Sequence, residues 1–181
     1  MLHVVGRVTE PVARFIGPSL SLLHGDGRPQ ELLLLDGPAL SRVREAVPSG
    51  TALHRVQVPS QGGRWWPLRR AFEQRLSRGP VPAVHFHGLL PWLTCMAGRT
   101  SAQPVYLSPH GSRGLSVLPA LLPLMRHTPR LIATSDREAA RLQRMGLIVA
   151  AWHPVLEDVY LNTARHRSEE HTSELQSQST I

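Results

Sequence analysis

The chain has 181 residues, enough for one domain with a substantial hydrophobic core. Its formal net charge is +7, but all 20 basic residues are arginine and they are scattered along the chain. Nucleic-acid-binding surfaces cluster their basic residues on one face, so we expect no nucleic-acid partner. The single cysteine, Cys95, excludes an internal disulfide, is typical of a reducing compartment, and lies in an apolar stretch where we expect a buried thiol.

Neither a secretion signal nor a membrane span is visible in the sequence. The chain opens directly into the short apolar run Leu2–Gly6, and its longest apolar run, Leu115–Met125, is broken by Pro119 and Pro123. A membrane-spanning helix needs roughly 20 apolar residues in succession. We therefore expect a cytoplasmic protein, with at most a peripheral contact at the inner face of a membrane.

Short apolar runs alternate with helical patterns along the chain, which is typical of a buried, mostly parallel sheet. The first expected strands are Leu2–Gly6, Glu31–Leu35 and Ala52–Val58. A helix should begin at Pro11 and be interrupted or kinked at Gly17-Pro18. Another should follow Trp66-Pro67, because Leu68, Phe72 and Leu76 fall four residues apart, and Gly79-Pro80 should end it.

Three further strands end abruptly at His, Gly or Ser. They are Ala83-Val84-His85-Phe86-His87-Gly88, Val105-Tyr106-Leu107-Ser108-Pro109-His110-Gly111 and Leu131-Ile132-Ala133-Thr134-Ser135. In parallel sheets ligands bind outside the carboxyl ends of the strands, so these endings outline one candidate site. After them, Ser135 and Glu138 form a capping box at the start of a helix that Gly146 closes, and Leu147–Trp152 is the last expected strand.

The ordered series of these motifs resembles the amino-terminal, acceptor-side domain of retaining glycosyltransferases of family 4, which have the GT-B fold. The resemblance runs from Met1 to about Tyr160 and includes Leu2–Gly6, the three strand endings, and His153-Pro154-Val155. It implies a three-layer, Rossmann-like α/β domain over residues 1–160, with the start of an interdomain linker at 161–166. The chain departs from the family in the loop Arg7–Pro11, which lacks the usual Gly-Gly pair, and at His153-Pro154, where Asn-Pro is usual.

The resemblance also implies a reaction. The intact enzyme would transfer a sugar from a nucleotide-diphosphate sugar, its donor substrate, to a carbohydrate or lipid-linked acceptor, retaining the anomeric configuration and using no further cofactor. Such enzymes contribute to bacterial cell-envelope polysaccharides. The donor site lies in a carboxy-terminal domain, so we expect the present chain to need that domain as a partner and to be inactive alone.

We expect His110 to be the catalytic residue, because it follows a strand end and an imidazole can donate or accept a proton near neutral pH. We expect His87 to line the cleft and His85 to pack below it. Further candidate substrate-binding residues come from the loops after the strands: Gly6, Arg7, Thr9, Glu10, Gly111, Ser112, Arg113 and Ser135. Trp65-Trp66 could stack on a sugar or touch a lipid, although packing under the following helix is the simpler expectation.

Two other classes of function stay open: a non-catalytic sugar- or nucleotide-binding domain, and a metal-dependent hydrolase. His85 and His87 share a strand face, as in zinc hydrolases, and His110 and Asp136 could complete such a ligand set. The set is incomplete, so we predict no metal. A dinucleotide-binding loop is not indicated, because Gly6-Arg7-Val8-Thr9 lacks the further glycines.

The last residues differ in composition from the rest of the chain. Arg167–Ser177 resembles the in-frame translation of a short-read sequencing adapter. We interpret residues 167–181 as a non-native, disordered tail. On this interpretation the natural protein continues beyond His166.

Overall fold

The computed structural model describes residues 1–8, 10–25, 27, 29–36, 40–58, 63, 65–110, 113–124 and 126–151, with only the backbone at a few of these positions. Seven strands are present in this part: β1 Leu2–Arg7, β2 Glu31–Leu35, β3 Ala52–Val56, β4 Val84–His87, β5 Val105–Ser108, β6 Arg130–Ala133 and β7 Val149–Ala151. The helices are α1 Glu10–Gly25, α2 Leu40–Ala46, α3 Trp65–Ser77, α4 Leu89–Met96, α5 Leu118–Leu121 and α6 Asp136–Arg144. The predicted domain end, linker and adapter-like tail lie outside the described residues.

All seven strands belong to one sheet with the order β3-β2-β1-β4-β5-β6-β7, and all six pairings are parallel. Helices connect successive strands, so the chain is an α/β domain of the Rossmann-like kind, as predicted. The sheet grows outward from β1 in both directions. Strand order therefore reverses between β1 and β4, which defines a topological switch point.

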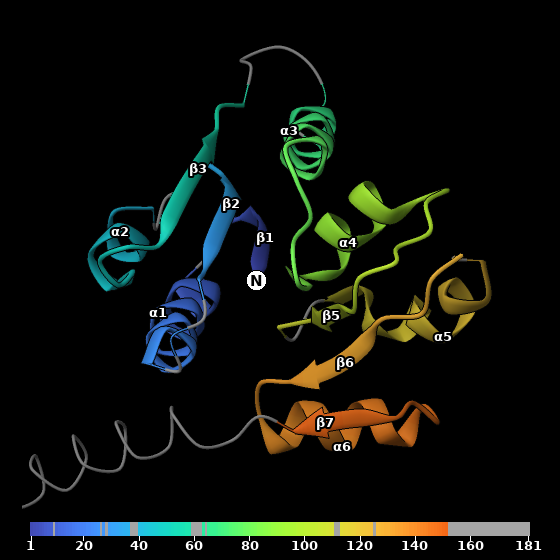
Figure 1. Cartoon of the computed structure of the whole chain (residues 1–181). Coiled ribbons are helices and arrows are strands. Elements are labelled where there is room, and N and C mark those ends of the chain that lie inside the picture. The colour runs from blue at the N-terminus through green and yellow to red at the C-terminus, as the bar shows by residue number, and fades with distance from the viewer. Residues whose placement is uncertain are drawn as a thin grey trace, which may run out of the picture.

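The sheet separates two hydrophobic cores, because successive strand side chains point to opposite faces. On one face Val5, Leu32 and Leu34 pack against α1 and α2. On the other face strand residues such as Val4 and Phe86 pack against α3, α4, α5 and α6. Figure 1 shows α1 and α2 on one side of the sheet and α3 and α4 on the other, which makes the three layers visible.

Helix α1 runs without interruption through Gly17-Pro18, so the predicted interruption is wrong. A Cβ on Gly17 would lie 2.6 Å from the Cβ of Ala46, so the glycine allows α1 and α2 to approach closely. The hydroxyl groups of Ser19 and Ser21 donate to carbonyl oxygens four residues earlier, at 2.7 and 3.1 Å. Packing between helices, rather than intrinsic propensity, keeps this segment helical.

Three other elements differ from the sequence prediction. Helix α2 was not expected, β3 ends at Val56 rather than Val58, and β7 begins at Val149 rather than Leu147. Among the described residues, no helix is long and apolar enough to cross a membrane. Cys95 is buried as expected, and burial raises the pKa of its thiol to about 12, so it is a packing residue.

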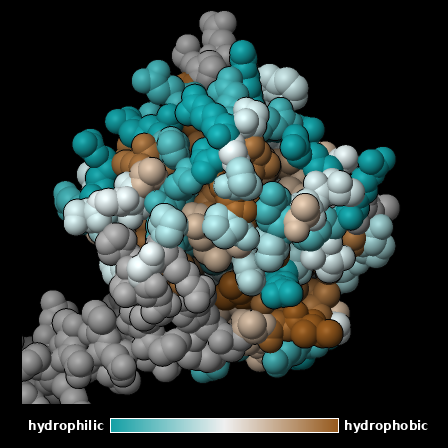
Figure 2. Space-filling view, viewed as in Figure 1, coloured by the Kyte–Doolittle hydropathy of each residue, from teal (hydrophilic) through white to brown (hydrophobic). Residues whose placement is uncertain are grey.

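The visible surface is mainly hydrophilic, with a hydrophobic patch at the lower edge in Figure 2, where β7 lies in Figure 1. Strand β7 is an edge of the sheet, and Ile148 just before it is 96% exposed. Leu147, Ile148 and Leu131 contribute to a hollow of about 480 Å³ at this edge. Of the large hydrophobic side chains in the described residues, the most exposed one therefore lies beside β7.

Candidate functional site

The carboxyl ends of β1, β4 and β5 meet where the strand order reverses. Val5 is paired with His87 between β1 and β4, and His87 is paired with Ser108 between β4 and β5. In open α/β sheets this crevice is where ligands bind. The predicted site therefore coincides with the topological switch point.

Three histidines gather on the α1 face of this region. His3 of β1 and His85 and His87 of β4 are each at most 3% exposed. They share a face because His85 and His87 are two residues apart and His3 pairs in register with His85. His87 is therefore buried in this chain, and its predicted place in the lining of the cleft remains a prediction.

A continuous series of hydrogen bonds joins this group to His110. His3 Nε2 lies 2.9 Å from Gln30 Oε1, and His3 Nδ1 lies 3.0 Å from His87 Nε2. His87 Nδ1 lies 3.0 Å from His110 Nε2. His85 makes a separate bond, with Nε2 2.9 Å from Ser108 Oγ.

His110 is held in an unusual backbone conformation just beyond β5. Its φ is +53°, the only positive value for a non-glycine residue in the described part of the chain. Left-handed residues of this kind cost free energy and gather at functional sites. The edge of the His110 ring also packs against Phe15 of α1, with centroids 4.9 Å apart.

Burial keeps these four imidazoles neutral. It lowers the pKa of His3 and of His110 to about 4, with the nearby Glu138 carboxylate opposing the shift at His110. The pKa values of His85 and His87 are also well below the ordinary value, first because of burial and then because neighbouring histidines disfavour additional charge. At neutral pH each ring therefore has one N–H donor and one acceptor nitrogen.

Ser135 caps α6 as predicted, since its Oγ accepts from Glu138 N at 3.2 Å. The second half of the capping box differs from the prediction. Glu138 Oε2 accepts from the N–H and the hydroxyl group of Thr134, at 2.8 and 2.9 Å, one residue before the cap. The carboxylate therefore fixes the end of β6 to the start of α6, close to His110.

Gly6 has a packing role in the structure. A Cβ at this position would lie 2.8 Å from Pro91 Cγ and 2.9 Å from Trp65 Cζ3. The register of β1 against β2 also shifts between Val5 and Arg7. Gly6 therefore allows α3 and α4 to reach the strand, and its predicted ligand contact remains a prediction.

The structure leaves several predicted side chains untested. Thr9, Gly111 and Ser112 lie outside the described residues. Arg7 ends β1, Glu10 begins α1 and Arg113 begins a 3-10 turn, but their side chains are not described. Ser135 is exposed at its cap position.

Three residues of the site were not selected by sequence reasoning: His3, Gln30 and Ser108. The usable signal was the alternation of strand side chains, which places His3 on the same face as Val5. Gln30 directly precedes β2, and Ser108 ends β5. Their contacts could be found only with the register of neighbouring parallel strands.

The structure also changes the composition of the possible metal set. One ring nitrogen from each of His3, His85 and His87 lies within 4.8 Å of the others, which could suit a metal ion. His110 and Asp136, the additional ligands considered from the sequence, do not belong to this group. The nitrogens of His3 and His87 that face each other are already 3.0 Å apart, as in a hydrogen bond.

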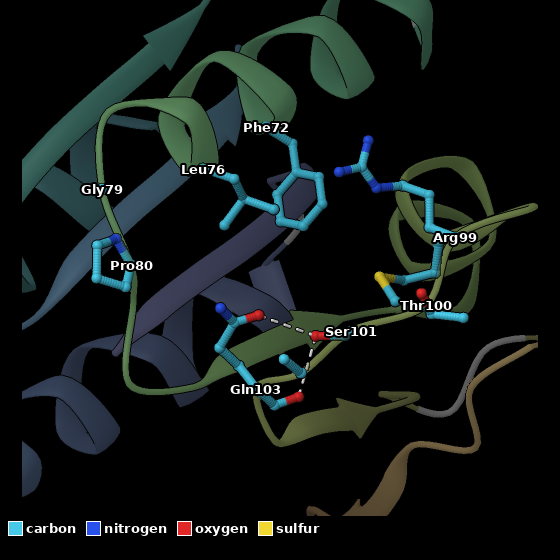
Figure 3. A pocket seen from close by; sticks show the side chains of 10 residues that line it. Phe72, Leu76, Gly79, Pro80, Arg99, Thr100, Ser101 and Gln103 are labelled. Atoms are coloured by element: carbon cyan, nitrogen blue, oxygen red, sulfur yellow. Dashed lines mark hydrogen bonds between the residues drawn. The ribbon is translucent and has the colours of Figure 1, made fainter.

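Two hollows lie at the opposite end of the sheet from His110. Figure 3 shows the first, a cavity of about 210 Å³ lined by the segments that lead into β4 and β5. Two of its polar side chains have partners: Ser101 Oγ donates to Gln103, and Arg99 donates to Glu73. The second is the hollow beside β7. Neither hollow includes a predicted site residue.

The two tryptophans at the start of α3 have different environments. Trp65 packs against the core, as expected, whereas Trp66 is 69% exposed. Leu90, near the start of α4, is 54% exposed. Packing therefore accounts for Trp65 and leaves Trp66 accessible.

Comparisons with known proteins assign no family. No protein-family model matches the chain, and no curated protein matches it. A UGT transferase from Siraitia grosvenorii, solved in complex with UDP, is similar in structure with 9% sequence identity and a TM-score of 0.45. The similarity covers 84% of this chain and 50% of the transferase, so the chain spans about half the length of that protein. No function follows from a similarity at this level.

Proposed function

We propose that the chain is the acceptor-side domain of a GT-B glycosyltransferase, of the retaining family 4 type that its motifs resemble. The observation that carries the proposal is the position of His110. It lies at the carboxyl edge of a parallel sheet, beside the switch point, with a strained backbone and a buried hydrogen-bonded partner.

In this proposal His110 contacts the transferred sugar or the reacting centre. Its ring is neutral, so one nitrogen is available to accept a hydrogen bond from a hydroxyl group. The loops that contain Arg7, Thr9, Glu10, Gly111, Ser112 and Arg113 would contact the acceptor or a phosphate group. Trp66, which is exposed, could stack on a carbohydrate acceptor.

The proposed donor is a nucleotide-diphosphate sugar held by a second domain, and the acceptor is a carbohydrate or a lipid-linked glycan. Transfer therefore needs both domains, and the present chain would bind acceptor without catalysing transfer. We further propose a bacterial, cytoplasmic enzyme of cell-envelope polysaccharide synthesis that contacts the inner membrane surface when its acceptor is lipid-linked.

The first prediction concerns activity. His110→Ala in the natural gene product that contains residues 1–166 should lower kcat for transfer by at least about 100-fold, because a positioned imidazole contributes on that order. The assay would use radiolabelled nucleotide sugars and follow label into glycan and lipid fractions. His127→Ala is the matched control, since His127 lies before β6 at the opposite end of the sheet.

The same assay separates the alternatives. Unchanged transfer by the His110→Ala protein would remove the proposed role of His110. Binding of glycans without transfer by the natural protein would favour a non-catalytic binding domain.

A metal-dependent hydrolase is the second candidate, favoured by the three ring nitrogens within 4.8 Å. Stoichiometric zinc in the purified protein, together with loss of that zinc in His85→Asn, would support a metal-dependent hydrolase over a glycosyltransferase.

A further inference from the structure

We propose that Gln30, His3 and His87 are positioning residues that fix the tautomer of His110. Through consecutive hydrogen bonds, of which the first two are buried, they require His110 to donate from Nε2 and to present Nδ1 as an acceptor at the carboxyl edge of the sheet. The consequence for substrate binding rests on the proposed function, whereas the tautomer itself does not.

The hydrogen bonds from Gln30 through His3 and His87 to His110 form a relay that is continuous across four neighbouring segments. Gln30 precedes β2, His3 lies in β1, His87 ends β4 and His110 follows β5. The three contacts measure 2.9, 3.0 and 3.0 Å. The rings of His3 and His87 are inclined by 24°, and those of His87 and His110 by 23°. Nearly coplanar rings suit such bonds, because the lone pair of an imidazole nitrogen lies in the ring plane.

The chemistry of Gln30 sets the direction of the relay. Its Oε1 can only accept, so His3 must donate from Nε2 and accept at Nδ1. His87 must then donate from Nε2 and accept at Nδ1. His110 must in turn donate from Nε2, and its Nδ1 keeps a lone pair. With Gln30 Oε1 facing His3, this is the one assignment in which every contact pairs a donor with an acceptor.

The relay requires neutral rings, because a protonated imidazole donates from both nitrogens. Burial supplies this condition by lowering the pKa of His3 and of His110 to about 4. Glu138, the charged group that acts on His110 from α6, opposes the shift without cancelling it. The neighbouring rings of His85 and His3 add to the depression of the His87 pKa.

His85 and Ser108 provide an internal control, since they are equally buried but lie outside the relay. Ser108 Oγ can donate or accept, so it imposes no tautomer on His85. Phe15 holds the His110 ring by packing and has no hydrogen-bonding group. The direction of the relay therefore depends on Gln30.

The chemical consequence is that His110 Nδ1 is fixed as a hydrogen-bond acceptor before a substrate binds. A hydroxyl group of a bound sugar could donate to His110 Nδ1 without first selecting a tautomer. If the Gln30 amide were reversed, its NH₂ group would donate to His3, each bond would change direction, and His110 would present a donor. The orientation of one amide thus determines what His110 offers to a substrate.

The test is long-range ¹H–¹⁵N correlation NMR of the ¹⁵N-histidine-labelled chain at pH 7.5. We expect His3, His87 and His110 each to be the Nε2–H tautomer. Gln30→Leu should convert His110 to a mixture of tautomers, because the fixed acceptor is lost. Gln30→Glu should retain the Nε2–H form, because both carboxylate oxygens accept. Gln74→Leu, at an exposed position, and Ser108→Ala should leave the His110 signals unchanged.

The wild-type spectrum alone can overturn the proposal, whether or not Gln30→Leu folds. A proton on His110 Nδ1 in the wild-type protein would overturn it. An unchanged His110 tautomer in folded Gln30→Leu would also overturn it. Binding of one equivalent of Zn²⁺ that shifts His3 Nδ1 and His87 Nε2 would assign these atoms to a metal instead. The expected tautomers together with unaffected transfer by His110→Ala would refute the proposed role of His110 in transfer and leave the relay intact.

Discussion

Gly6 has a packing role that its place after the first strand did not indicate. Gly6 is a candidate substrate-binding residue because it lies where β1 leads into its loop, and such loops often contact ligands. In the structure the approaching groups are Pro91 and Trp65. A missing side chain can serve packing as well as binding, and the sequence does not distinguish the two.

Gly6→Ala should therefore destabilise the protein. The added methyl group would lie under 3.0 Å from two ring atoms, and overpacking of this kind costs about 1–3 kcal/mol. Urea unfolding measures the effect. Gly63→Ala is the matched control, because no atom lies within 4 Å of its added Cβ, and its change should stay within about 0.5 kcal/mol. Equal stability of the two variants would contradict this account of Gly6.

At the scale of elements, the histidines couple β1, β4 and the segment after β5. His3, His85 and His87 are buried, His110 is half-buried, and all four are neutral, whereas the same residues titrate near pH 6.5 when unfolded. Between pH 6.5 and 4 the unfolded chain therefore binds more protons than the folded chain. The free energy of unfolding must fall as the pH falls through this range.

Each fully buried imidazole should contribute up to about 1.4 kcal/mol per pH unit to this loss. Urea unfolding at several pH values between 7.5 and 5 would measure the slope. His85→Leu removes one of these groups and should reduce the slope by about that amount. His127→Leu, which replaces a less buried histidine, should leave the slope nearly unchanged. The same slope in wild type and His85→Leu would show that His85 is already protonated in the folded protein.

Most strands could be predicted because buried parallel strands consist of short apolar runs, such as Glu31–Leu35, which matches the structure residue for residue. Helix α2 was not predicted from the sequence, because it has only seven residues and Val43 is the one that is buried. The continuity of α1 depends on a contact between Gly17 and Ala46 that no local pattern encodes.

The residues of the candidate site also divide into those that the sequence can predict and those that it cannot. His110 and the Ser135 cap are readable from strand endings and from local spacing. The contacts of His3 cannot be read from the sequence, since its partners lie 27 and 84 residues away along the chain and the contacts depend on strand register.

At the scale of the whole molecule, the edge strand β7 follows the most exposed large hydrophobic side chain in the described part of the chain, Ile148. Unpaired strand edges with apolar side chains promote association between copies of a chain. Ile148 is 96% exposed beside this edge, and the hydrophobic patch in Figure 2 lies there.

Ile148→Lys should reduce association without changing stability by more than about 0.5 kcal/mol, because the side chain makes little contact in the folded chain. Dynamic light scattering over a concentration series, with thermal melts, would measure both effects. Leu90→Lys tests whether replacing any exposed apolar residue reduces association, and we expect a smaller reduction at that position. Association that is unchanged by Ile148→Lys would show that the β7 edge is not responsible.

The central position of β1 also constrains the order in which the protein can be built on the ribosome. The first strand synthesised must pair on both sides, with β2 soon afterwards and with β4 only after Val84 has emerged. At roughly 5–20 residues per second, the interval between Leu35 and Val84 lasts several seconds, during which one edge of β1 stays open. His3 gains its bond to His87 in the same step that covers this edge. The candidate site is therefore assembled only when the two halves of the sheet join.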